Sequence, residues 1–270
     1  MRRVAVVLVM VVSLLAVPAA AQARALETLP GTAWWTDPAT GERHVAADAS
    51  VGERDLRRLA ASAGTVVREP GVRRQFLAGG DPIFPGGSSR CTIGFNVRST
   101  STPYRYYFIT SGHCVGPVGT TVSSGGTVIG TVERRLDPRD LALVRYTPPS
   151  GTVQPPHPSA VNRYNGTLQP ITTFATAFVG QGVQRADSTT GLRSGTVTAL
   201  NATVNYAEGT VYGLTRTTVC AEPGDSGGPF FSTTTGLGTF SGGSGNCTSG
   251  GVTYFAPVLP YLSGWGVGAY

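Results

Sequence analysis

Lysine is absent from the 270-residue chain, and all 21 of its basic residues are arginines. Charged residues make up only 13% of the chain. Beyond residue 77 only Arg134, Arg135 and Arg139 lie close together in the sequence, and no aromatic residues are interleaved with them. Nucleic-acid-binding surfaces combine clustered basic residues with groups that stack on bases. The sequence therefore argues against nucleic acid as a partner.

Long apolar runs are also scarce, with one near the N-terminus. Arg2 and Arg3 precede an apolar run from Val4 to Val17, and residues that a signal peptidase accepts follow at Ala21, Ala23 and Ala25. This order is typical of a secretory signal, and a run of about 14 residues is short of the roughly 20 that span a bilayer. We expect residues 1–25 to be removed, the mature protein to be secreted, and no membrane to be a partner afterwards.

Cysteine and histidine are rare, with four and three residues. The cysteines lack the paired short intervals that zinc sites use, so we expect no metal ion and no other cofactor. In an oxidising extracellular environment the four cysteines are expected to form disulfides, for which three pairings are possible.

Glycine and proline are abundant, with 37 and 19 residues, which is typical of an all-β protein with many turns. Beyond Cys91 the apolar residues alternate in strand-length segments. Before the proline-rich stretch 148–158 these segments are 92–97, 106–110, 127–132 and 140–146, and after it they are 171–179, 195–200, 210–214, 236–240 and 252–255. Two halves of about six strands each predict two packed β-barrels or sandwiches.

The distribution of charge divides the rest of the chain into two parts. Residues 26–76 hold seven arginines and seven acidic residues, several of them in the run Glu53 to Arg58. The spacing of Leu56 and Leu59 in the same region predicts a short amphipathic helix. Residues 77–270 hold eleven arginines and eight acidic residues, a modest net charge of +3. At about 50 residues, the first part is small for an independently stable domain. It is either a flexible spacer or a pro-segment that acts on the second part and is then cut away.

Glycines surround one serine in the segment Gly224 to Pro229, which reads GDSGGP and exposes the hydroxyl of Ser226. A serine hydroxyl is a weak nucleophile at neutral pH, so it needs a base within hydrogen-bond reach and donors for the oxyanion. The backbone N–H groups of Gly224 and Ser226 lie on the same side of such a turn. We therefore predict that they form an oxyanion hole, with no Cβ at residue 224 to block the approach.

Only two histidines in the second part are available as the base. His113 lies in a fixed turn just past an apolar strand, whereas His157 lies among prolines and is expected to be solvated. His113 is therefore the predicted base. An acid must fix the tautomer of the base, and Asp140 heads an apolar strand, where it can be shielded from water. Asp137 precedes a proline and suits a turn instead.

Three segments carry a resemblance to a known family. TSGHC (110–114), DLALVRY (140–146) and CAEPGDSGGP (220–229) resemble the active-site segments of the chymotrypsin family, in the chain order His, Asp, Ser. More narrowly, TALNATVNY (198–206) and SGGSGNCTSGG (241–251) are similar to the secreted bacterial streptogrisins. The resemblance extends from about residue 77 to the C-terminus, and residues 34–47 and 66–80 also resemble the pro-region that precedes these proteases.

The resemblance implies two packed antiparallel six-stranded β-barrels, at about residues 77–158 and 159–270, with the active site between them. In this arrangement Ser226 attacks the peptide carbonyl, His113 transfers the proton and Asp140 orients His113, through an acyl-enzyme intermediate. The substrates are then proteins or peptides, and the enzyme is expected to be a monomer. A catalytically silent, protease-like binding protein is the alternative, although such a protein would usually have lost one of these three residues.

The resemblance also assigns structural partners. Asp225 lies inside the serine turn and needs a positive partner if it is buried. Arg185 occupies the place of an internal arginine that serves this purpose in streptogrisins, and a surface position is the alternative for it. Chain order and the family together favour the disulfides Cys91–Cys114 and Cys220–Cys247.

The walls of a primary specificity pocket are expected at Ala221, Glu222 and Pro223 on one side and at Ser241, Gly242 and Gly243 on the other. The second wall should also pair with the substrate backbone. Two glycines leave room for a large side chain, and no charge is evident at the base, so we expect cleavage after large apolar or aromatic residues. Phe240 stands where streptogrisins usually have a small residue and a glutamate-preferring branch has histidine, which argues against acidic substrates but narrows the pocket.

The family's mature chains begin four residues before an aspartate, here Asp81, which places the cut between Phe76 and Leu77. Because Phe76 is aromatic, an enzyme with the expected preference can release itself. We therefore expect a self-processing zymogen whose pro-segment, residues 26–76, acts as folding aid and inhibitor. Cleavage after Arg74 by another protease and cleavage after Leu77 are the alternatives.

Overall fold

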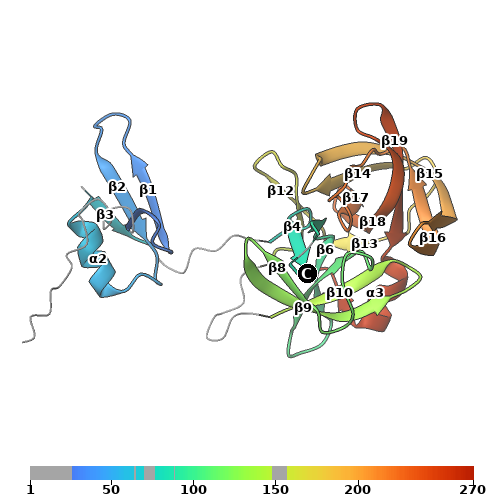
Figure 1. Cartoon of the computed structure of the whole chain (residues 1–270), viewed down its shortest axis with the longest axis horizontal. Helices are drawn as coiled ribbons and strands as arrows, with labels where there is room; N and C mark the ends of the chain where they lie inside the picture. Colours follow the sequence, from blue (N-terminus) through green and yellow to red (C-terminus); the bar gives the residue numbers. More distant parts are fainter. Residues whose placement is uncertain (1–25, 64, 70–76, 88, 148–156) are drawn as a thin grey trace, which may run out of the picture. The chain divides into compact units, whose positions relative to one another are not determined.

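The computed structural model describes residues 26–63, 65–69, 77–87, 89–147 and 157–270, so the expected signal peptide lies outside the described residues. The chain divides into two compact units, residues 1–75 and 76–270, and each is described by itself (Figure 1). No helix in the described residues is both long and apolar enough to cross a membrane.

The first unit has a three-stranded sheet and one helix, with elements β1 (Thr32–Thr36), β2 (Arg43–Ala47), α2 (Glu53–Ala60) and β3 (Thr65–Arg68). β2 pairs antiparallel with β1 and parallel with β3, and a parallel pair needs a crossover such as α2. The predicted amphipathic helix is observed and ends at Ala60. Its Leu59 is buried in one apolar cluster with Val45 and Val51. A unit with its own core is not a flexible spacer.

The second unit begins with a curled sheet of strands β4 (Pro82–Pro85), β5 (Cys91–Thr92), β6 (Phe95–Ser99), β7 (Tyr106–Thr110), β8 (Thr121–Ser124), β9 (Thr127–Leu136) and β10 (Leu141–Tyr146). The strand order is β20-β6-β7-β10-β9-β8-β4-β5, in which β20 (Val267–Gly268) comes from the C-terminus. Its apolar interior includes Ile83, Phe108 and Val144.

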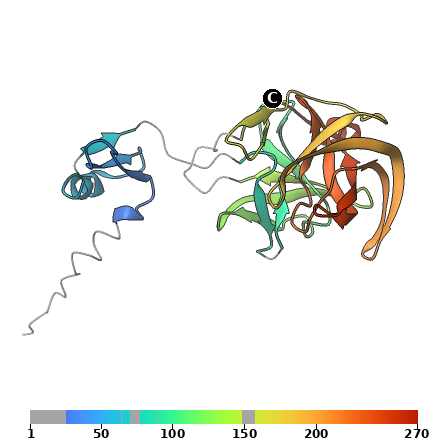
Figure 2. The same ribbon diagram turned by 90° about the horizontal axis from the view of Figure 1, so that it is seen from above.

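The C-terminal half forms a second curled sheet of strands β13 (Thr173–Phe174), β14 (Gly182–Asp187), β15 (Gly191–Tyr206), β16 (Gly209–Thr217), β17 (Pro229–Ser232), β18 (Thr235–Asn246) and β19 (Gly250–Pro257). The order is β13-β18-β17-β14-β15-β16-β19, and β18 also pairs with β19, which closes six strands into a barrel. A small sheet of β11 (Ala160–Asn162) and β12 (Leu168–Pro170) precedes it, and the helix α3 (Leu259–Trp265) follows it. Figure 2 shows the two curled sheets side by side.

The two barrels share a core. Phe95, Ile109 and Leu141 from the first barrel belong to one cluster of buried apolar side chains with Leu214 and Phe231 from the second. Because this cluster holds the barrels against each other, residues at their common edge have fixed relative positions. The expected all-β fold of two packed barrels is confirmed, although the first sheet has eight strands because the short strands β5 and β20 add to its ends.

Individual elements differ from the sequence-based predictions. The segments 106–110 and 140–146 match β7 and β10 closely, whereas 171–179 contributes only the two residues of β13. The expectation that His157 is solvated is wrong, because it is 3% exposed and its ring stacks on Tyr146 with 3.4 Å between centroids. Burial lowers the pKa of His157 to about 4, so this histidine is neutral at neutral pH.

Candidate active site

Two neighbouring strands bring His113 and Asp140 together. β7 and β10 are antiparallel with Thr110 opposite Ala142, so residues that follow β7 lie beside residues that precede β10. The Asp140 carboxylate accepts a hydrogen bond from the backbone N–H of His113 at 2.8 Å and lies 2.9 Å from the ring Nδ1. With Nδ1–H donating to the carboxylate, Nε2 remains as the basic nitrogen.

Asp140 is held by a third donor that the sequence pattern did not predict. The hydroxyl of Ser241 donates to Asp140 Oδ2 at 2.6 Å, across 101 positions of the chain. Asp140 is 5% exposed and has φ +56°, a left-handed conformation that aspartate tolerates better than most residues. Asp137 instead pairs with Arg135 at 2.9 Å, with a side chain that is 60% exposed. The structure therefore separates the two candidate acids.

The environment of His113 affects its pKa in two directions. Burial lowers the pKa, whereas the hydrogen bond and negative charge of Asp140 raise it, and the charge of Glu208 raises it further. The net result is a pKa above the usual value of 6.5. A ring with a raised pKa accepts a proton readily, which suits a general base.

The serine turn leaves two N–H donors unused. Four backbone N–H groups between residues 222 and 228 donate to acceptors within the protein. The N–H groups of Gly224 and Ser226 have no acceptor among the described residues. Gly224 has φ +96°, and a Cβ there would lie 2.5 Å from Thr189 Oγ1, so this position requires glycine. Two free N–H groups in this spacing are what an oxyanion hole needs.

Ser226 and His113 line the same cleft of about 840 Å³, together with Asp140 and Ser241. The carbonyl of Ser226 accepts a hydrogen bond from the N–H of Thr92 at 2.8 Å, which connects the serine turn to the first barrel. No hydrogen bond within the described residues joins Ser226 Oγ to His113 Nε2. That contact commonly forms only when substrate is bound.

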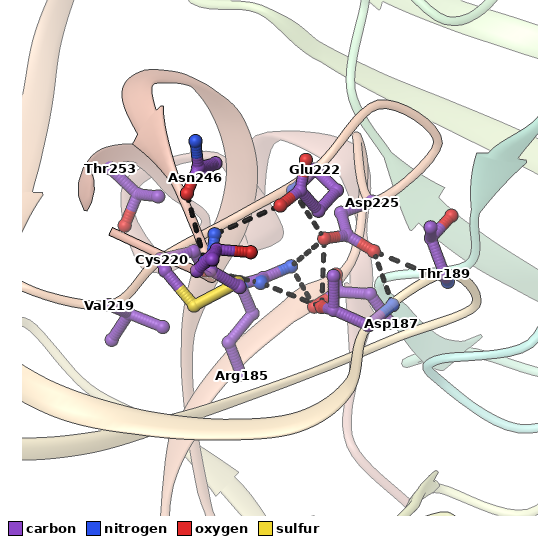
Figure 3. The surroundings of a disulfide bond; sticks show 12 residues. Arg185, Asp187, Thr189, Val219, Cys220, Glu222, Asp225, Asn246 and Thr253 are labelled. Atoms are coloured by element: carbon purple, nitrogen blue, oxygen red, sulfur yellow. Dashed lines mark hydrogen bonds and ion pairs between the residues drawn. A yellow bond between two sulfur atoms is a disulfide. The ribbon is translucent and has the colours of Figure 1, made fainter. Parts of the chain in front are cut away.

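A buried ion pair supports the serine turn. Arg185 Nη1 lies 3.1 Å from Asp225 Oδ2, and both side chains are fully buried (Figure 3). Asp225 also accepts hydrogen bonds from the backbone N–H and the hydroxyl of Thr190. The guanidinium of Arg185 lies over the ring of Phe240, 5.2 Å from its centroid. The surface alternative for Arg185 is therefore excluded.

A second carboxylate in this cluster, Asp187, was not predicted. It contacts Arg185 and is equally buried (Figure 3). Burial raises the pKa of Asp187 well above its usual value, Arg185 opposes this effect, and the charge of Asp225 adds to it. Burial therefore favours the protonated form of Asp187 more strongly than in an exposed carboxyl group. The sequence could have indicated this contact, because Arg185 and Asp187 are two residues apart on β14 and so share one face of the strand.

The disulfides join Cys91 to Cys114 and Cys220 to Cys247, as expected. Cys114 is adjacent to His113, and the carbonyl of Cys220 accepts a hydrogen bond from Arg185. The two bridges therefore constrain the histidine turn and the segment that precedes the serine turn.

A pocket of about 270 Å³ opens beside Ser226, and its lining includes Ala221, Glu222, Pro223, Phe240 and Gly243. The carboxylate of Glu222 accepts the N–H of Cys247 at 2.9 Å. Ser241 and Gly242, which were expected in the same wall, line the adjoining cleft of His113 instead. Beyond Phe240, β18 pairs only with β19 among the described strands, so its other edge is open to an extended peptide.

Comparisons with known proteins give a consistent result. The Trypsin family model matches residues 78–264. Streptogrisin-A of Streptomyces griseus is 44% identical over 243 residues, which cover 87% of this chain and 77% of that protein. The crystal structure of Thermobifida fusca protease A is 46% identical with a TM-score of 0.63, and covers 72% of this chain and 98% of that one. The crystal structure of a chymotrypsin from Cellulomonas bogoriensis is 43% identical with a TM-score of 0.62. The match covers 73% of this chain and 99% of that one. The chain therefore belongs to the trypsin family and is a streptogrisin-like serine endopeptidase.

Proposed function

We propose that this endopeptidase is secreted, hydrolyses peptide bonds with His113, Asp140 and Ser226, and cleaves after large apolar or aromatic residues. The observation that carries the proposal is what surrounds Ser226. A histidine fixed by a buried carboxylate lines the same cleft, and two unpaired N–H donors belong to the serine turn itself.

In the first half of the reaction Ser226 Oγ attacks the carbonyl carbon of the scissile bond, and its proton passes to His113 Nε2. The N–H groups of Gly224 and Ser226 stabilise the resulting oxyanion, where one donor contributes about 3 to 4 kcal/mol. When the tetrahedral intermediate collapses, the C–N bond breaks and His113 gives its proton to the leaving amine. Asp140 stabilises the imidazolium throughout and keeps Nε2 directed at the serine.

In the second half a water molecule replaces the leaving amine. His113 takes a proton from the water, and the hydroxide attacks the ester carbonyl of the acyl-enzyme. The second tetrahedral intermediate then expels Ser226, which recovers its proton from His113. The free carboxylic acid leaves and the enzyme returns to its starting state.

The pocket beside Ser226 supports an apolar preference. Phe240 contributes to its lining, whereas Arg185, on which the Phe240 ring stacks, does not. Glu222 is the charged residue of the lining, and its carboxylate is engaged by Cys247. An acidic substrate side chain would face the carboxylate of Glu222 with no cation beside it, which is unfavourable. An apolar side chain would displace water from the pocket and bury apolar surface, which is favourable.

The proposal includes activation by self-cleavage between Phe76 and Leu77, a bond at the edge of the described residues. The carbonyl of Leu77 accepts a hydrogen bond from Asn96 at 2.6 Å, so the chain is attached to the first barrel from this residue onward. Asp225 already has Arg185 as its partner, so a new N-terminus is not required to form the serine turn. Removal of an inhibitory pro-segment, residues 26–76, is then sufficient to produce an active monomer.

A sulfonyl fluoride tests the proposed catalytic residues directly, because it reacts with an activated serine. We expect one label per molecule on Ser226, measured by mass spectrometry, and none in Ser226→Ala or His113→Ala. A peptide library should then show cleavage after large apolar residues. An unlabelled protein that still binds peptides would support the catalytically silent alternative.

A further inference from the structure

The clefts around Ser226 define a direction for the bound peptide. The pocket beside Ser226 takes the side chain before the scissile bond, and the cleft of about 840 Å³ shares Pro223 and Gly243 with it. Residues before the bond therefore pass through that cleft. A further cleft of about 450 Å³ is lined by His113, Ser226 and the Cys91–Cys114 disulfide but by no residue of β18. Residues after the bond must leave through this second cleft, on the far side of His113.

The cleft before the bond has one uncompensated charge, and it is negative. Glu208, at the tip of the β15–β16 hairpin, is exposed and lines this cleft with His113. It makes no ion pair or hydrogen bond within the described residues. The other charges are paired, since Arg135 binds Asp137 at 2.9 Å and Asp140 is held by His113 and Ser241.

The cleft after the bond has one charge, and it is positive. Arg90 lines this cleft, and no acidic residue does. Its Nε donates to Ser188 Oγ at 3.1 Å and its Nη2 donates to the carbonyl of Ser188, which fixes the guanidinium in place. Nη1 has no partner among the described residues. The arginine stem also passes close to Gly224, because a Cβ at that glycine would lie 3.6 Å from Arg90 Cδ.

We infer that the cleft is electrically polarised along the substrate, with Glu208 favouring a basic residue before the scissile bond and Arg90 an acidic residue after it. This polarity rests on the proposed roles of Ser226 and His113, which set the direction of the peptide. The charge-selected positions are the second or third residue before the bond and the first or second residue after it, because the residue directly before the bond occupies the separate pocket beside Ser226. One exposed charge pair changes binding by about two- to fivefold at low salt.

Three peptides with the same phenylalanine before the scissile bond test the polarity. One is neutral, one has lysine before and glutamate after the bond, and one has these charges reversed. We expect kcat/KM of the mature enzyme to be at least about tenfold higher for the lysine-before peptide than for its reverse at low ionic strength. The ratio should approach one in about 1 M salt, where charges are screened beyond about 3 Å. Equal rates for the two charged peptides at low salt would overturn the inference.

Single variants assign each half of the preference. Measured with peptides that carry a charge on only one side of the bond, Glu208→Gln should abolish discrimination at the positions before the bond and keep that after it, and Arg90→Gln should do the reverse. Glu133→Gln and Arg105→Gln are matched controls. Glu133 faces Arg145 at 3.6 Å, Arg105 lies just before β7 at the end opposite His113, and neither lines these clefts. A similar loss in the controls would show that the preference depends on total charge and would contradict the assignment.

The same peptides with a ketomethylene group in place of the scissile amide separate this inference from the proposed function. Their Kd values for the mature protein, measured by calorimetry, do not depend on catalysis. If no peptide is cleaved but the Kd values keep the expected order, the proposed function is wrong and the polarity stands. If all peptides are cleaved and the Kd values do not depend on charge, the polarity is wrong and the proposed function stands.

Discussion

The single carboxylate of Asp140 accepts from three donors, the His113 backbone, the His113 ring and the Ser241 hydroxyl. All three donors need an oxygen acceptor, and the two carboxylate oxygens provide it. An asparagine would replace one of these oxygens with an N–H₂ donor and could not accept from all three. The left-handed φ of +56° adds a second constraint, because most residues are strained there. Asp140 is therefore a position where both the charge and the backbone conformation are determined by the site.

Asp140→Asn should lower kcat by about four orders of magnitude at neutral pH, because the amide would stabilise the wrong tautomer of His113. Asp137→Asn is the matched control, since Asp137 lies three residues away and pairs with Arg135 on the surface. It should keep kcat within about twofold. Hydrolysis of a neutral peptide substrate measures both, and a rate above about a tenth of wild type for Asp140→Asn would contradict the assignment of this residue.

Asp187 predicts a stability that falls as pH rises. Its pKa in the folded state is well above the usual 3.8, so the folded protein binds more protons than the unfolded chain above pH 4. The contribution of this carboxyl is fully present below about pH 4 and is lost as pH rises through the folded pKa. The asparagine side chain of Asp187→Asn carries no charge at any pH. This variant should therefore lose less of its free energy of unfolding than the parent as the pH rises.

Guanidinium unfolding of the sulfonyl-labelled enzyme between pH 4 and 10 measures this effect without self-digestion. Asp137→Asn serves again as the control, because Asp137 is mostly exposed. We expect Asp187→Asn to be at least as stable as the parent at the alkaline end. An unchanged slope in that variant would show that Asp187 titrates as it does in the unfolded chain.

At the scale of elements, β18 supplies three different parts of the site. Phe240 lines the pocket beside Ser226, and Ser241 donates a hydrogen bond to Asp140. Gly243 lines both that pocket and the cleft of about 840 Å³. A register shift between Phe240 and Gly242 in the pairing of β18 with β19 interrupts the regular alternation. Such an irregularity redirects side chains within a strand, which explains why Ser241 contacts Asp140 rather than the pocket.

The serine turn is an element whose chemistry depends on its backbone. Gly224→Ala would place a Cβ 2.5 Å from Thr189 Oγ1 at φ +96° and displace one of the two free N–H groups. We expect kcat to fall by about 100- to 1000-fold with little change in KM, as for the loss of one oxyanion donor. Gly182→Ala is the control, because a Cβ at residue 182 would have no atom within 4 Å. Equal kcat values for the two variants would exclude Gly224 from the oxyanion hole.

At the scale of the whole molecule, the protease unit consists of two barrels whose strands pair over long distances. β20 pairs with β6, and the hydrogen bond from Thr92 to Ser226 joins residues of different barrels. Contacts of this kind form slowly, because the entropy of loop closure must be overcome first. The first unit has its own core, and we propose that it acts as a folded partner during this step.

Residues 77–270 expressed alone should therefore refold in low yield, and residues 26–76 added as a separate chain should raise the recovered activity. The measurement is peptidase activity after dilution from denaturant, with and without the added segment. A variant segment with Leu59→Asp is the control, because Leu59 is fully buried in the core of that unit. High recovery without any segment would contradict a folding role.

Ser226→Ala should accumulate as an unprocessed precursor of residues 26–270 in a host that lacks other secreted proteases. N-terminal sequencing of the wild-type product distinguishes three outcomes, with Leu77 indicating self-cleavage after Phe76, Gln75 a trypsin-like host protease, and Ala78 cleavage after Leu77. Trimming of Ser226→Ala at Leu77 would exclude self-processing. The aromatic residue before the cut, Phe76, would then no longer support an apolar preference of this enzyme.

Features that depend on neighbouring residues could be predicted from the amino-acid sequence. The glycines around Ser226, the turn of His113 and the apolar strand after Asp140 are local patterns, and they singled out three residues that line one cleft of the fold. β7 and β10 were also predictable, because continuous apolar runs between turns leave few alternatives.

Features that depend on distant residues required the folded chain. The contact of Ser241 with Asp140, the burial of Asp187 beside Arg185 and the stacking of His157 on Tyr146 each join positions whose partners no local pattern specifies. The division of the expected pocket wall between two cavities depends on a strand irregularity that periodicity cannot reveal. Burial and long-range pairing are properties of the packed barrels, so they become visible only when both barrels are in place.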